Sequence, residues 1–139
     1  MLFILVVLAA LGAALAKISQ RQQLGSASEI DAARAFQSAR AGLEWGAWQT
    51  LRNPPPPAAA PACFATTSFQ PPASLAGFTV TVRCTRTPAS GTVSDGATAL
   101  AFYELVGNAC NAPSAGACPG SGTLAQTYVE RQLTWTVVR

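Results

Sequence analysis

The chain of 139 residues holds few side chains that could carry out catalysis. It contains no histidine, which excludes Ser-His-Asp and Cys-His catalysis and zinc sites of mixed cysteine and histidine. The remaining candidate acids and bases are Glu29, Asp31, Glu44, Asp95, Glu104 and Glu130. The first three fall on an expected helix and Asp95 in an Asp-Gly turn, so solvated charges and helix pairs such as Arg40 with Glu44 are favoured over a glycosidase-like pair. We expect no enzyme, and no catalytic, cofactor-binding or metal-ligating residue.

Four cysteines are the other reactive side chains: Cys63, Cys84, Cys110 and Cys118. They are separated by 20, 25 and 7 residues and lack the close pairs that a four-cysteine zinc site requires. An even number of cysteines in an exported domain is typical of disulfides. Of the three possible pairings we favour Cys63 with Cys84, which ties a connector to the first strand, and Cys110 with Cys118, which closes a small loop.

Other binding chemistry has little support in the sequence. The net charge of +3 comes from scattered arginines, so nucleic acid has no basic stripe to bind. The glycines between Gly116 and Gly122 precede no helix and do not form a phosphate loop. Trp45, Trp48 and Trp135 could form a sugar platform, but their places in the apolar patterns favour packing.

Residues 1–16 form an uncharged run, MLFILVVLAALGAALA, in which only Gly12 is not apolar. As a helix this run is about 24 Å long, which is short of the roughly 30 Å hydrocarbon core of a membrane. Two interpretations compete: a secretory signal cleaved after Ala16, or a membrane anchor whose first residues are missing. The signal lacks a preceding basic region, and the anchor meets Lys17 and Arg21 on its exported side.

The helical pattern continues beyond residue 16. Residues 17–52 contain no proline. Apolar side chains recur there mostly three, four or seven residues apart, at Ile30, Ala33, Phe36, Leu43, Ala47 and Leu51. Four prolines from Pro54 onward end the helix at Arg52. A helix over residues 1–52 is about 78 Å long, so part of it must be buried outside its own small domain.

The remaining residues predict a small β domain. Residues 53–74 hold seven of the ten prolines and are expected to be a stiff connector without regular structure. Within residues 75–139, apolar alternation predicts strands over 77–83, 97–108 and 126–138, in a three- or four-stranded antiparallel sheet. The expected fold class is α+β, with the second half of the helix across one face of the sheet. The expected core between helix and sheet consists of Phe36, Leu43, Trp45, Trp48, Leu51 and Trp135.

This order of segments resembles a type IV pilin or pseudopilin: an apolar N-terminus, a long amphipathic helix, a proline-rich break and a cysteine-bearing β domain. Four stretches are similar to MshP-like minor pilins of the mannose-sensitive haemagglutinin (MSHA) type IV pilus system, which serves cell adhesion. They are residues 33–46, 75–84, 109–119 and 128–133, and the most specific is ARAGLEWG at residues 39–46. The resemblance implies a pilin-like fold and a structural role in pilus assembly. The implied partners are other pilin and minor pilin subunits, the inner membrane and the pilus assembly platform.

Pilins of this class begin with a basic leader that ends in glycine, and none is present before the apolar run. We therefore expect the reading frame to continue upstream of Met1 through such a leader, as a substrate for prepilin peptidase; an in-frame stop codon just upstream of Met1 would contradict this. The protein would then be a single-pass inner-membrane protein with a periplasmic C-terminal domain, able to enter the extracellular pilus. The residues expected in the membrane and fibre helix are Leu2, Phe3, Leu5, Leu8, Gly12 and Leu15.

Two alternatives stay open. One is a minor pseudopilin of a type II secretion system, which would belong to a different assembly machine but assemble by the same physical interactions. The other is a soluble periplasmic binding or adhesive module released by signal cleavage after Ala16. Membrane fractionation separates the anchored forms from the released module.

Overall fold

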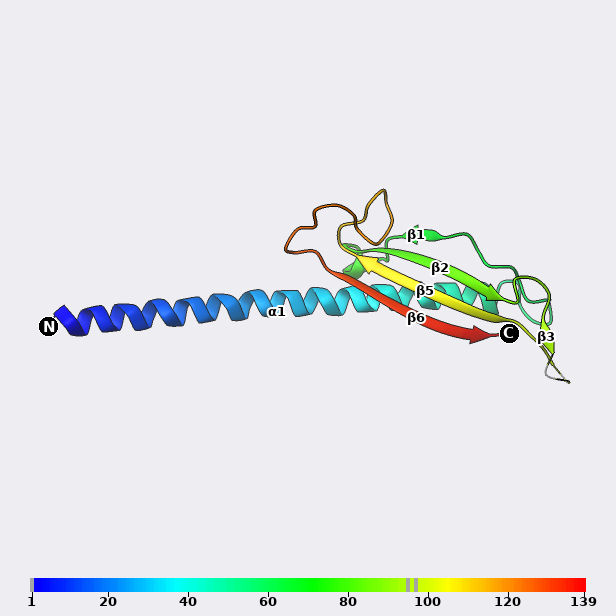
Figure 1. Ribbon diagram of the computed structural model, residues 1–139, viewed down its shortest axis with the longest axis horizontal. Coiled ribbons are helices and arrows are strands. Elements are labelled where there is room, and N and C mark those ends of the chain that lie inside the picture. Colours follow the sequence, from blue (N-terminus) through cyan, green and yellow to red (C-terminus); the bar gives the residue numbers. More distant parts are fainter. Residues whose placement is uncertain (1, 95, 97) are drawn as a thin grey trace. The chain divides into compact units, whose positions relative to one another are not determined.

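The structure is a computed structural model that describes residues 2–94, 96 and 98–139. Its fold class is α+β with an antiparallel sheet, which confirms that part of the prediction (Figure 1). The elements in chain order are α1 (Leu2–Leu51), β1 (Thr67–Phe69), the 3-10 helix η1 (Ala73–Leu75), β2 (Thr79–Thr87), β3 (Val93–Ser94), β4 (Ala99–Leu100), β5 (Phe102–Cys110) and β6 (Glu130–Val138). The chain divides into two compact units, Met1–Asp31 and Ala32–Arg139.

The C-terminal end of α1 is fixed by the last residue of the chain. The final carbonyl groups of a helix have no partner within the helix. Here Nη1 of Arg139 donates a hydrogen bond of 3.0 Å to the carbonyl oxygen of Thr50, and Nη2 donates one of 2.8 Å to that of Ala58. Arg139 therefore holds both the helix end and the proline-rich segment that follows it.

The four-stranded sheet has the order β1-β2-β5-β6, with every neighbouring pair antiparallel. The three predicted strands are present with shifted bounds, as β2, β5 and β6. Ala97, the first residue of the predicted strand 97–108, lies outside the described residues.

The expectation that residues 53–74 lack regular structure is wrong at two places, β1 and η1. β1 joins the edge of β2, with Phe69 opposite Val80, and the Ser68 and Thr81 hydroxyl oxygens lie 2.9 Å apart. A short run of residues that favour strands is enough for this pairing, because β2 supplies a full row of backbone partners. A second small ribbon, β3 with β4, lies between β2 and β5 in the sequence.

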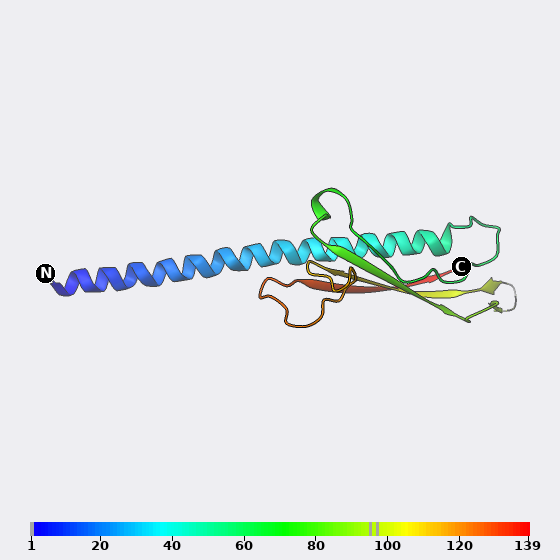
Figure 2. The ribbon, with the colours of Figure 1, turned by 90° about the horizontal axis from the view of Figure 1, so that it is seen from above.

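Within the unit Ala32–Arg139, α1 covers one face of the sheet, and the segment between β5 and β6 lies against the other face (Figure 2). Alternation along the strands separates the two faces. Val80, Val82, Leu105 and Gly107 face α1, whereas Thr81 accepts a 2.8 Å hydrogen bond from the backbone N–H of Cys118 on the opposite side.

α1 packs on the sheet through small side chains. The buried positions of its second half are Ala35, Ser38, Ala39, Gly42, Leu43, Gly46 and Thr50. A Cβ atom on Gly42 would overlap Cγ1 of Val80. A Cβ atom on Gly107 of β5 would lie 2.8 Å from the carbonyl oxygen of Ala39. The helix backbone therefore approaches the sheet more closely than larger residues would allow.

This close packing corrects part of the predicted core. Phe36 and Trp48 are 42% and 53% exposed, so placing them in the core was wrong. Each lies six residues from Gly42, which puts it about 120° around the helix from the contact with the sheet. The prediction followed large apolar side chains, whereas the contact is made by small ones.

The other four predicted core residues lie at or beside the helix–sheet contact. Leu43 is fully buried, and Leu51 and Trp135 are half-buried. Trp45 is also half-buried and packs against the core cluster of Ala39, Val80, Val82 and Ala109. Its ring meets that of Phe64 edge-on, with centroids 4.9 Å apart, and lies 5.7 Å from that of Phe69. Trp45 therefore joins the helix to the segment that precedes β2.

Candidate assembly surface

Residues 3–16 of α1 carry apolar side chains around the whole circumference of the helix. Among the residues expected in the fibre helix, Phe3 is 79% exposed, Leu5 64%, Leu8 60% and Leu15 67%. A Cβ atom at Gly12 would meet no described atom within 4 Å, and the side chain of Leu2 lies outside the described residues. A helix that is apolar on all sides is stable when lipid or other protein covers it. This segment is therefore the strongest candidate for a contact with something outside the chain.

In the part of the chain that is described, no helix has the length and apolarity needed to cross a membrane.

The second half of α1 adds two large exposed side chains, Phe36 and Trp48, on the sides that the sheet leaves open. Between them in sequence, Nε of Arg40 lies 2.9 Å from Oε1 of Glu44, the helix pair expected from their spacing. Both side chains of this pair are more than half exposed, so the pair contributes little to stability. The outward side of α1 therefore combines two large apolar groups with one salt bridge.

The two disulfides form with the predicted pairing, Cys63 with Cys84 and Cys110 with Cys118. The first ties the segment after the prolines to β2, and its two cysteines are half-buried. The second ties the end of β5 to the segment that covers the outer face of the sheet, and Cys110 and Cys118 are 0% and 2% exposed. Both bonds fasten irregular segments to the sheet.

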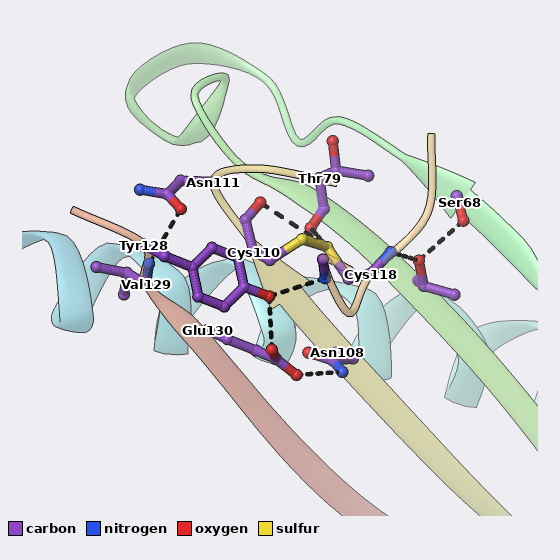
Figure 3. The surroundings of a disulfide bond; sticks show 11 residues. Ser68, Thr79, Asn108, Cys110, Asn111, Cys118, Tyr128, Val129 and Glu130 are labelled. Carbon is purple, nitrogen blue, oxygen red and sulfur yellow. Dashed lines mark hydrogen bonds between the residues drawn. A yellow bond between two sulfur atoms is a disulfide. The ribbon is translucent and has the colours of Figure 1, made fainter. Parts of the chain in front are cut away.

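A chain of hydrogen bonds surrounds the second disulfide (Figure 3). The hydroxyl of Tyr128 donates to Oε2 of Glu130 at 2.6 Å and accepts from the backbone N–H of Gly120 at 2.8 Å. Nδ2 of Asn108 donates to the other Glu130 oxygen at 2.7 Å. Burial, together with the hydrogen bond to Glu130, raises the pKa of Tyr128 above its ordinary value. These contacts join the covering segment to β5 and β6.

The carboxylates considered as candidate acids and bases do not gather into a site in the described structure. Glu44 pairs with Arg40, Glu130 is held by Tyr128 and Asn108, and Asp95 lies outside the described residues. No group of three or more histidine, cysteine, aspartate or glutamate side chains within the described ranges is placed to hold a metal ion. The candidate functional features are therefore the exposed surfaces of α1.

The small-residue face of α1 was missed by the sequence reasoning, although it left a signal. Ala35, Ala39, Gly42 and Gly46 follow one another four, three and four residues apart, the spacing of one helix face. Glycine inside a helix is unfavourable by about 1 kcal/mol relative to alanine, so two glycines on one face indicate a close approach.

Comparison with protein-family models, with curated proteins and with solved structures found no match for this chain. The protein is therefore described by its fold and by its exposed surfaces. The protein has a disulfide-bonded α+β domain and an uncovered apolar helical segment at its N-terminal end.

Proposed function

We propose that the protein is a structural subunit of a type IV pilus, a minor pilin of the MSHA type. The observation that carries the proposal is the exposure of the apolar segment from Phe3 to Ile18. Nine large apolar side chains in this segment are exposed, and leaving each in water costs about 1.5–3 kcal/mol relative to burial. A subunit that assembles through this segment removes that cost, whereas a free monomer in water does not.

The segment moves from one apolar environment, the lipid of the membrane, to another, the interior of the fibre. Lipid of the inner membrane covers it before assembly, and the helices of neighbouring pilin subunits cover it in the fibre. Gly12 and the alanines at positions 9, 10, 13, 14 and 16 support this exchange, because small residues let apolar helices approach each other closely. The pilus assembly platform drives the transfer, and the subunit performs no chemistry in it.

The remainder of the chain fits a part that is displayed outside the cytoplasm. Two disulfides fasten its irregular segments, and such bonds persist in oxidising compartments such as the periplasm. Phe36 and Trp48 offer a second contact with neighbouring subunits on the outward side of α1. The domain thus serves as a rigid block held in the fibre by its helix.

A single charge in the apolar segment tests the proposal. Leu8→Lys places an ammonium group where the subunit must stay dry and is expected to cost about 2.5–3.5 kcal/mol. A strain that lacks the native gene and expresses this variant should show reduced pilus assembly, measured in the sheared-fibre fraction.

Leu8→Ala is the matched control, because it also removes the leucine side chain at position 8 but keeps the segment apolar. It should assemble far better than Leu8→Lys. Undiminished assembly with Leu8→Lys would overturn the proposal.

A further inference from the structure

The charge along α1 changes where its apolar run ends. Residues 1–28 contain two charged side chains, Lys17 and Arg21, and both are positive. The first acidic residue, Glu29, follows Lys17 after twelve positions, which is about 18 Å along the helix. This distance exceeds the Debye length of about 8 Å at physiological ionic strength. Within α1, the ammonium group of Lys17 therefore has no counter-charge near enough to neutralise it.

Lys17 lies among exposed apolar side chains. It is itself exposed, Leu15 is 67% exposed and Ile18 is 54% exposed. Such a position suits the boundary of a lipid layer, because lysine can bury its aliphatic stem among apolar groups while its ammonium group stays in the polar region.

Arg21 adds a second charge at the same end of the apolar segment. It follows Lys17 by four positions, the spacing of one helix face, and its side chain lies outside the described residues. Basic residues are disfavoured on the exported side of a membrane segment. An anionic group that meets both of them would offset that cost.

We propose that Lys17 and Arg21 bind the headgroups of anionic phospholipids at the membrane surface, with phosphatidylglycerol as the model lipid. This inference rests on the proposed function, in which lipid covers the apolar segment before assembly. Each basic residue near an anionic membrane surface strengthens binding about fivefold, so the two together supply about 25-fold. A zwitterionic headgroup carries its own cation and attracts the two residues less.

Lipid binding by the full-length chain in a neutral detergent tests the proposal. Phosphatidylglycerol and phosphatidylcholine that carry the same fluorescent acyl chain are titrated separately, and fluorescence anisotropy gives the two affinities. The native chain should bind phosphatidylglycerol at least tenfold more tightly than phosphatidylcholine, and added salt should reduce this preference. The double variant Lys17→Gln with Arg21→Gln should bind the two lipids within about twofold of each other.

The matched control is the double variant Arg52→Gln with Arg83→Gln. It removes the same charge from two exposed positions of the second unit, and it should keep the full preference. Circular dichroism shows whether both double variants keep the native fold. Inorganic phosphate at the concentration of the lipid should not displace phosphatidylglycerol, because a free anion lacks the acyl chains that the apolar segment holds.

Three results would overturn the proposal: equal binding of both lipids by the native chain, the same loss of preference in both double variants, or displacement of the lipid by inorganic phosphate. Equal and tight binding of both lipids would leave the pilus proposal standing, because the apolar segment would still be covered by lipid. Failure of the native chain to bind either lipid would overturn this inference and also count against the lipid cover of that segment.

Discussion

Gly42 of α1 and Val80 of β2 lie so close that the glycine has no room for a side chain, because a Cβ atom there would overlap Cγ1 of the valine. Val80 is fully buried at the centre of the core cluster and cannot turn away into solvent. Gly107 meets the backbone of α1 from the opposite direction. Glycines on both elements thus set the distance between helix and sheet, and with it the position of the α1 surface that faces outward.

Gly42→Ala should destabilise the domain by about 1–3 kcal/mol, because the added methyl group overfills a packed core. Chemical denaturation followed by near-ultraviolet circular dichroism measures the change. Gly25→Ala is the matched control, since Gly25 is also inside α1 but its Cβ position is open. There alanine should leave stability unchanged or raise it, because it is the better helix former. Equal effects at the two positions would contradict the close contact.

This contact shows where prediction from sequence succeeded and where it did not. The strands β2, β5 and β6 were found because alternation along a strand is a local pattern. The disulfide pairing was found because each bond joins an irregular segment to a strand nearby in sequence. Phe36 and Trp48 were placed in the core wrongly because size and hydrophobicity were weighed, whereas Gly42 makes the close contact, with Val80, 38 residues away in sequence. β1 was missed because its pairing depends on β2 more than on its own three residues.

The two disulfides should open in a fixed order under mild reduction. A reductant must reach the sulfur atoms, and Cys110 and Cys118 are almost fully buried, whereas Cys63 and Cys84 are half-buried. Alkylation of the freed thiols followed by mass spectrometry should find Cys63 and Cys84 labelled first. Removing the second bond with Cys110→Ser and Cys118→Ser should cost about 2–4 kcal/mol. Earlier labelling of Cys110 and Cys118 would contradict the burial of that bond.

Tyr128 should resist ionisation, because burial and the hydrogen bond to Glu130 raise its pKa above the ordinary value of 10.0. A group whose pKa is raised on folding contributes stability below its unfolded pKa, and this contribution is lost as the pH rises through the folded pKa. The stability difference between the native chain and Tyr128→Phe should therefore be constant below about pH 10 and shrink above it. Denaturation of both proteins across this range measures the difference, and a difference that grows above pH 10 would contradict the assignment.

Trp48 should matter for assembly and not for folding. It is 53% exposed, so Trp48→Ser should change the free energy of unfolding by less than about 0.5 kcal/mol. If neighbouring subunits cover this side of α1, the variant should reduce the amount of protein in sheared fibres. Trp45→Ser is the contrasting variant, because Trp45 packs on Phe64 and the core and its loss should destabilise the domain. Full assembly of Trp48→Ser would remove Trp48 from the assembly surface.

If the protein is a pilus subunit, the apolar residues 3–16 stay on the mature protein and hold it in a membrane or a fibre. Fractionation of cells that express the untagged protein, with N-terminal sequencing of each fraction, tests it most directly. We expect protein in the inner-membrane and sheared-fibre fractions, with the apolar segment retained. Soluble periplasmic protein that begins at Lys17 would contradict it and support a released module instead.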